Sequence, residues 1–204
     1  MTEPYSPTDP LAVVLDIKDP HSYLAKDPTY ALADDLGIDV DWLPFVSRPM
    51  RRPLVPGDDR GSRHRHFRAA YIERSIKRSA GVRGITIRNI YRAPDSSLAC
   101  MGMLAAKAHS EGALRKYLDL AFRQYWEEDL DLEHPDTVSR LLSAASVVDF
   151  DPDSARLEAL RDSLSLAGVL ETPAYLVDGE VFLGRAHLPM IRWILEGRAG
   201  PPPI

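Results

Sequence analysis

The chain has 204 residues, enough for one sizeable core or for a small domain that carries an insertion. Its hydrophobic content of 45% and charged content of 27% are those of a globular protein. No apolar run approaches the roughly 20 residues that span a bilayer, and the acidic N-terminus lacks a secretory signal, so we expect a cytoplasmic protein without a membrane partner. The single cysteine, Cys100, excludes an internal disulfide, and we predict no metal site.

The net charge of -5 conceals a basic block. Residues 48–92 hold 13 of the 25 Lys and Arg residues but only 3 of the 30 Asp and Glu residues. Such a block can bind nucleic acid or a small anion, or it can face acidic parts of the same protein. Nucleic acid is disfavoured, because the apolar spacing within residues 67–76 indicates a packed helix and no nucleic-acid motif is present.

The first part of the chain predicts a βαβ unit. Residues 11–17 form a short β-branched run that is typical of a buried strand. Asp19 followed by proline predicts a helix start, because a carboxylate caps free N–H groups and proline suits the first helical position. We expect this helix over residues 20–36, with a kink or break near Asp27 caused by Pro28, and a second strand over residues 38–43.

The middle of the chain is helical and its end returns to strands. Five helices are predicted at residues 62–81, 95–110, 112–129, 135–147 and 152–167. An Asp-Gly turn then joins two strands at residues 174–177 and 180–184, which predicts an antiparallel hairpin. A last helix is expected at residues 186–196.

The order of these elements predicts an α/β fold. It is βαβ, then helices, then ββα, which together indicate a thioredoxin-like domain interrupted by an all-helical insert. We assign residues 1–47 and 169–204 to the thioredoxin-like domain and residues 48–168 to the insert.

Five motifs support this interpretation. They are DIKDPHSYLA (residues 16–25), DWLPF (41–45), PDSSLA (94–99), AFRQYW (121–126) and TPAYLVDGEVFLG (172–184). In content and order they resemble motifs of the DsbA-like proteins, and among these of the kappa-class glutathione transferases and 2-hydroxychromene-2-carboxylate isomerases. The resemblance implies a homodimer and a glutathione site where the first helix begins, opposite a cis-proline.

In this chain the cis-proline of the resemblance is Pro173. A cis bond leaves the N–H and C=O of Thr172 free to pair with an extended peptide ligand. The alternative is an ordinary trans proline that opens an edge strand. The flanking motifs favour the cis form.

Asp19 departs from the family pattern, which has a catalytic serine beside the glutathione sulfur. A carboxylate roughly 4 Å from a thiolate repels it by about 4 kcal/mol at an effective dielectric of about 20, so Asp19 should oppose thiolate formation. Two interpretations stay open. Asp19 either caps the helix only, or it is a general base that His21 or Ser22 assists from the same turn.

Other predicted ligand contacts come from the resemblance as well. Arg68 stands where the family has a lysine that faces the ligand's carboxylate, although it can equally be one more solvated arginine. The family's Asp-Arg pair, which helps to hold the γ-glutamyl end of glutathione, corresponds to Ala186 and His187, so this arm of the site is weakened. The predicted ligand-binding residues are Pro20, Arg68, Thr172, Pro173, Arg185 and His187.

The sequence therefore predicts a glutathione-dependent isomerase or transferase that acts on a small hydrophobic or aromatic electrophile, without dithiol–disulfide chemistry. The alternative is a catalytically silent protein of the same fold that binds a small anionic ligand or a protein partner. A homodimer is expected from the resemblance and from the opposed charges of the basic block and the acidic remainder.

Overall fold

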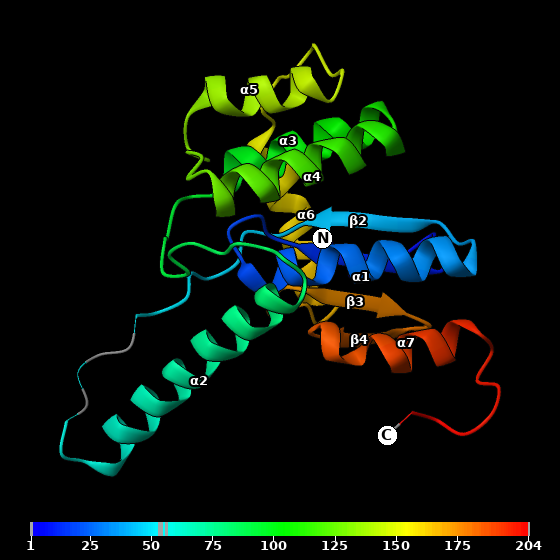
Figure 1. The fold of residues 1–204 in the computed structure, drawn as a ribbon. Helices are drawn as coiled ribbons and strands as arrows, with labels where there is room; N and C mark the ends of the chain where they lie inside the picture. Colours follow the sequence, from blue (N-terminus) through cyan, green and yellow to red (C-terminus); the bar gives the residue numbers. More distant parts are fainter. Residues whose placement is uncertain (1, 53–54, 56, 204) are drawn as a thin grey trace.

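A four-stranded mixed sheet forms the centre of the molecule in the computed structural model, which describes residues 2–52, 55 and 57–203 (Figure 1). The strands are β1 (Leu11–Leu15), β2 (Val40–Pro44), β3 (Ala174–Val177) and β4 (Glu180–Leu183). Their order is β2-β1-β3-β4, with β1 and β2 parallel and the other two pairs antiparallel. The two halves of the predicted domain therefore meet directly where β1 pairs with β3.

Helices surround the sheet and form a separate bundle beside β2 (Figure 1). Their bounds are α1 (Pro20–Leu36), α2 (Arg60–Val82), α3 (Ser97–His109), α4 (Glu111–Glu127), α5 (Pro135–Ala144), α6 (Ser154–Leu166) and α7 (Leu188–Leu195). A 3-10 turn, η1 (Arg185–His187), precedes α7 where one continuous helix was expected. The predicted α/β fold, a thioredoxin-like βαβ…ββα domain interrupted by helices, is confirmed.

The two faces of β1 enter two cores. Every residue of β1 is buried, which explains why its sequence is a continuous apolar run without alternation. Leu11, Val13 and Leu15 join the large core that includes side chains of α1 and α7. Ala12 and Val14 join a smaller core with Leu164 of α6. Helix α6 also packs on α3 through Leu157, so it contacts the sheet and the bundle.

Proline at position 28 does not break α1, so of the expected kink or break the break does not occur. The helix continues through Pro28 from Pro20 to Leu36. Because proline has no N–H, the carbonyl of Leu24, four residues earlier, loses its helical donor. The guanidinium of Arg83, just after α2, donates a hydrogen bond to that carbonyl instead. Arg83, one arginine of the basic block, thus stabilises α1 by replacing the missing helical donor.

The bundle is tied to the sheet by the AFRQYW motif. The indole N–H of Trp126, which is fully buried, donates to the carbonyl of Ile17 at 3.0 Å. Arg92 donates to the carbonyls of Tyr125 and Leu130 at 3.1 and 2.8 Å, which satisfies groups at the end of α4. The bond from Trp126 fixes the segment between β1 and α1. No helix among the described residues is long and apolar enough to cross a membrane.

The bond between Arg83 and Leu24 can be tested. Replacing Arg83 with methionine should lower the free energy of unfolding by about 1.5 kcal/mol, because a partly buried carbonyl loses a charged donor. In a Pro28→Ala background the carbonyl regains a helical N–H, so the same replacement should cost less than half as much. Urea unfolding of the four proteins measures this coupling as a double-mutant cycle. Equal costs in the two backgrounds would contradict the assignment.

Candidate functional site

Asp19 organises the start of α1. Its backbone is extended, with φ -92° and ψ 118°, and its side chain turns back over the first helical turn. Oδ1 accepts the N–H of His21 at 3.1 Å and Oδ2 accepts the N–H of Ser22 at 3.0 Å. Two of the N–H groups that lack partners at a helix start are thereby satisfied. The capping role predicted for Asp19 is confirmed.

The same carboxylate joins α1 to the segment before β3. Oδ2 of Asp19 also accepts the hydroxyls of Ser22 at 2.7 Å and of Thr172 at 2.9 Å. The Thr172–Pro173 peptide bond is cis, as predicted. The structure therefore brings four predicted site residues together: Asp19, Ser22, Thr172 and Pro173.

Burial governs the protonation of Asp19. Its side chain is almost fully enclosed, and this desolvation raises the pKa of the carboxyl above its ordinary value. The charge of His21 and the hydrogen bonds from Ser22 and Thr172 oppose the rise in pKa without cancelling it. Asp19 thus takes up a proton more readily than an exposed carboxylate does. It remains held by four donors, so positioning is its evident role.

Ser22 has no free hydroxyl for nucleophilic attack. The residue is fully buried, its O–H donates to Asp19, and its oxygen accepts the N–H of Asp16 at 3.2 Å. Pro20 is buried at the first helical position. His21 is only partly buried, so of the three predicted catalytic residues its side chain is the one that faces the solvent side of this turn.

A second buried carboxylate, Asp16, lies close to the start of α1 and holds the neighbouring segment after β2. Its Oδ2 accepts the N–H of Ser47 at 2.7 Å and the hydroxyl of Ser47 at 2.8 Å. The ammonium of Lys18 lies 3.7 Å from the same oxygen. Burial raises the pKa of Asp16, while the charge of Lys18 and the bonds from Ser47 lower it. Asp16 thereby fixes the chain that leaves β2, a role the motif did not reveal.

A cleft of about 710 Å³ opens beside Asp19 and Thr172. Its walls come from the start of α1, the segment after β2, the last turns of α6 and the segment before β3. The lining residues are Asp19, His21, Phe45, Val46, Ser47, Arg48, Met50, Arg161, Ser165, Val169, Leu170, Glu171 and Thr172. The cleft combines an apolar surface with charged groups of opposite sign.

Arg48 and Arg161 are functional candidates that the sequence analysis did not single out. Arg48 follows Ser47, whose position Asp16 fixes. Arg161 reaches the cleft from α6 together with Ser165, which lies one turn later on the same helix face. Arg161 also forms an ion pair with the adjacent Asp162, with 3.4 Å between the guanidinium nitrogen and the carboxylate oxygen, and both side chains are about half exposed. Only the helical spacing of positions 161 and 165 could have indicated this face.

Of the six predicted ligand-binding residues only Thr172 lines this cleft. Pro20 and Pro173 are next in sequence to lining residues, and the other three lie elsewhere. Arg68 lies on α2 and lines a different cavity. Arg185 donates to the hydroxyl of Ser79 at 2.7 Å, and its charge adds to burial in lowering the pKa of Arg83. His187 lies against the ring of Phe182, with the ring centres 5.6 Å apart. The residues expected after the last strand thus serve contacts between α2, η1 and β4.

Cys100 is placed as a core residue. It is 1% exposed and packs with Leu104 and Leu157. Burial raises the pKa of its thiol well above the ordinary value, and the charge of Asp16 raises it further. A thiol that is buried and protonated does not attack disulfides. The start of α1 therefore presents a carboxylate and an imidazole but no sulfur.

No known protein-family profile matches the chain, and no curated protein matches its sequence. Several solved structures match its fold. A protein described as a probable DsbA oxidoreductase from Streptomyces coelicolor matches with a TM-score of 0.70 and 17% identity over 96% of this chain and 93% of the other. A 2-hydroxychromene-2-carboxylate isomerase matches with a TM-score of 0.63 and 17% identity over 92% and 93%.

The description of a third structural neighbour names a bound ligand. The cytosolic disulfide reductase DsbM from Pseudomonas aeruginosa, solved with GSH, matches with a TM-score of 0.57 and 18% identity over 92% of this chain and 98% of the other. At these identities the comparisons concern the fold. The chain has the DsbA-like thioredoxin fold that the motifs indicated.

The raised pKa of Asp19 predicts a pH dependence of stability. The folded protein holds the Asp19 proton more tightly than the unfolded chain, so this group favours folding at low pH and the benefit disappears as pH rises through its folded-state pKa. In the Asp19→Asn variant the amide cannot titrate, yet asparagine caps a helix as well as aspartate does, with a change of about a few tenths of a kcal/mol. The free energy of unfolding of the native protein minus that of Asp19→Asn should therefore increase as pH falls from neutral.

Chemical unfolding of the two proteins from pH 7 downwards measures this difference. Asp27→Asn is a suitable control, because Asp27 lies on the same helix with its side chain 56% exposed. A difference between native protein and Asp19→Asn that decreases on acidification would contradict the raised pKa.

Proposed function

We propose that the cleft beside Asp19 is the active site of an isomerase- or transferase-like enzyme whose substrate is a small acid with an aromatic or hydrophobic body. The lining of the cleft carries the proposal. Arg48 and Arg161 offer guanidinium groups suited to a carboxylate, and Phe45, Met50 and Leu170 offer apolar surface for the body. A volume of about 710 Å³ falls within the range of small-molecule sites.

His21 is the residue that we assign to proton transfer. It lines the cleft, is only partly buried, and its backbone is held by the Asp19 cap. Imidazole is the side chain that most often moves protons in enzymes. Asp19 and Ser22 are positioning residues in this proposal, because their polar atoms are occupied by one another and by neighbouring groups. An isomerisation that moves one proton requires no thiol from the protein.

Glutathione is the proposed co-ligand. No backbone hydrogen bond of Thr172 occurs among the described residues, so its N–H and C=O can pair with a peptide backbone. The DsbM structure, whose description includes GSH, supports the same ligand class. Asp19 opposes the thiolate form, as its charge stands where the family pattern has a serine. Glutathione would therefore bind here as the thiol, without the added affinity that a stabilised thiolate provides.

A second candidate function is binding of a small anion or a protein partner without turnover. The engagement of Ser22 and the burial of Cys100 favour it, because neither offers a nucleophile to the cleft. The two candidates differ in one observable: whether the ligand is chemically changed.

The cleft can be tested with 2-hydroxychromene-2-carboxylate, an aromatic carboxylate named by one structural neighbour. Arg161→Met should weaken its binding about tenfold, or about 1.4 kcal/mol, because one charged contact to the carboxylate is lost. Arg156→Met is the matched control, since Arg156 lies on the same helix but lines another cavity. Calorimetric titration measures the affinities.

The absorbance of the ligand reports turnover in the same samples. His21→Gln should abolish the absorbance change and leave binding nearly intact. Unchanged affinity in Arg161→Met would contradict the site, whereas binding without any absorbance change by the native protein would favour the second candidate.

Asp19→Ser tests the electrostatic effect on glutathione. The serine removes a negative charge beside the sulfur, so affinity for reduced glutathione should rise at least about tenfold. The fold should lose about 1 kcal/mol, because the hydroxyls of Ser22 and Thr172 lose an acceptor. Calorimetry with reduced and S-methylated glutathione separates the sulfur from the peptide part. Weaker binding of reduced glutathione by Asp19→Ser would show that the charge has the opposite effect.

A further inference from the structure

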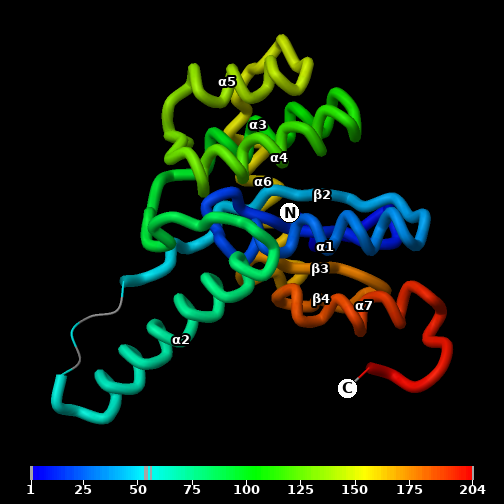
Figure 2. Tube along the Cα trace, viewed as in Figure 1, coloured from blue at the N-terminus to red at the C-terminus, as the bar shows by residue number. Residues whose placement is uncertain are grey.

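Most of α2 is exposed to solvent. Of its 23 residues only Ile76 and Ala80 are buried, and these lie near its C-terminal end. The remainder extends away from the rest of the molecule as an arm (Figures 1 and 2). Helices in proteins owe most of their stability to packing of an apolar face, so the outer part of α2 lacks the packing that usually supports such an element.

The arm combines positive charge with exposed aromatic rings. It holds seven Lys and Arg residues against one acidic residue, Glu73. Among the described Lys and Arg residues of this helix, only Lys77 forms an ion pair, with Glu73. Phe67 and Tyr71 lie one turn apart and are 63% and 62% exposed. Exposed aromatics beside arginine are typical of protein interfaces.

A cavity of about 520 Å³ lies between the arm and the segment that precedes it. Arg51, Arg52, Arg65 and Arg68 line it, and no carboxylate of the described residues does. Guanidinium groups gathered in this way repel one another until an anionic partner lies between them. The positive charge of the arm therefore favours binding to a surface rich in carboxylates or phosphates.

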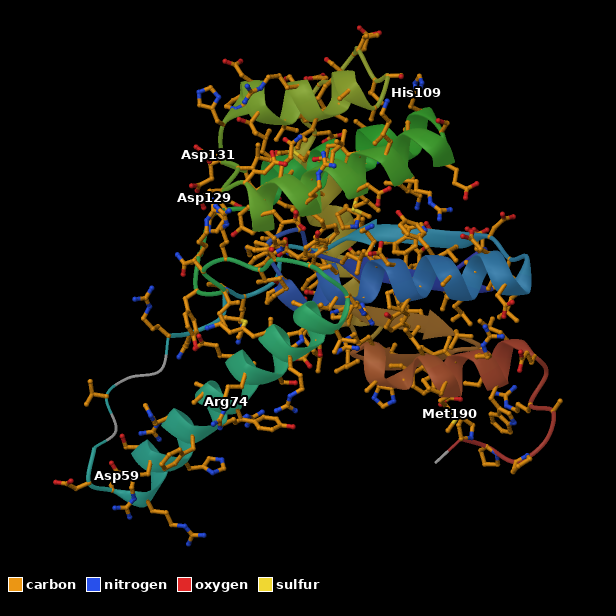
Figure 3. The ribbon with its side chains drawn as sticks, in the orientation of Figure 1. Asp59, Arg74, His109, Asp129, Asp131 and Met190 are labelled. Atoms are coloured by element: carbon orange, nitrogen blue, oxygen red, sulfur yellow. The ribbon has the colours of Figure 1, made fainter. Side chains whose placement is uncertain are left out.

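The chain supplies a carboxylate-rich surface of its own. Residues 127–136, from the end of α4 into α5, contain six acidic residues and no Lys or Arg. Asp129 pairs with Arg92 and Glu128 with Arg123 within the chain, so the segment keeps an excess of negative charge. Figure 3 shows Asp129 and Asp131 at the edge of the bundle, well apart from Asp59 and Arg74 on the arm. The two surfaces consequently do not meet within one chain.

We propose that the arm of one copy docks on the acidic segment 127–136 of a second copy, and that the second arm docks in the same way in return. Such an exchange is the two-fold arrangement in which each surface meets its complement. The part of α2 before Ile76 has 16 residues and is about 24 Å long, so half of its surface is roughly 400 Å². One arm and an equal area of acidic segment give each copy roughly 800 Å², the size of a stable interface.

A second copy fits the arm better than a nucleic acid does. Outside residues 48–92 the chain carries 27 acidic and 12 basic residues, so most of its surface repels phosphates. The same excess of acid attracts another arm. The pairing with residues 127–136 also brings the exposed rings of Phe67 and Tyr71 against protein.

Light scattering on the full chain provides the first test. At micromolar concentration and about 0.1 M salt the mass should be twice 22.8 kDa. It should fall towards 22.8 kDa at about 1 M salt, where the screening length decreases from about 10 Å to 3 Å. A monomeric mass at about 0.1 M salt would overturn the proposal. Nucleic acid that copurifies with such a monomer would point to the rival partner.

Charge reversal identifies the surfaces. The pair Arg65→Glu with Arg68→Glu, and separately the pair Glu128→Lys with Asp131→Lys, should each weaken self-association at least about 100-fold. Mixing the two variants should restore dimers, because the reversed arm then meets the reversed segment and the native arm meets the native one. Recovery of the dimer mass on mixing is specific to an exchange of these two surfaces.

Circular dichroism confirms that each variant is folded before its mass is measured. Lys116→Glu, an exposed change on α4 away from residues 127–136, is the control and should leave the dimer intact. Dimers that survive either double reversal, or folded variants that stay monomeric when mixed, would overturn the proposal.

Discussion

The hydrogen bond from the Thr172 hydroxyl to the Asp19 carboxylate joins two halves of one domain across 153 residues of sequence. Strand pairing between β1 and β3 brings the halves together, but this bond fixes the relative position of the helix start and the cis-proline. The same carboxylate caps α1, so a single side chain sets the geometry on both sides of the cleft. The cleft lies beside the helix start and the segment before β3, which these hydrogen bonds hold together.

Around this bond the protein has built a layer of buried polar groups. Asp16, Lys18 and Ser22 are nearly inaccessible to solvent, and each has partners. Buried polar groups are costly unless satisfied, but when satisfied they restrict the chain to one arrangement. Here the layer directs Ser47 and Arg48 to the cleft. The hydrogen bonds of this buried layer thus make the site rigid, while the groups that face the cleft stay free to bind a ligand.

The strands and the helices could be predicted from the sequence, because apolar periodicity and capping residues are local signals. The cis-proline could be predicted because the motifs around it resemble those of the family. Residue-level roles carried over from the resemblance stay predictions, because they depend on geometry that the motifs do not contain. Arg68 stands at a motif position, but where its side chain lies depends on how α2 leaves the domain, as does the contact of Arg185 with Ser79 of α2. Arg161 lines the cleft only because α6 turns back onto the sheet. Long-range geometry of this kind has no local signature.

The hydrogen bond from Arg83 to the Leu24 carbonyl, which Pro28 leaves without a helical donor, has a consequence for how the sequence can change over evolutionary time. While proline occupies position 28, the Leu24 carbonyl depends on the arginine, so selection must retain residue 83. Once another residue replaces the proline, its N–H takes over and position 83 is released from that constraint. The permitted order of substitutions is therefore proline first and arginine second. Positions 28 and 83 should co-vary among homologues, although 55 residues separate them in the chain.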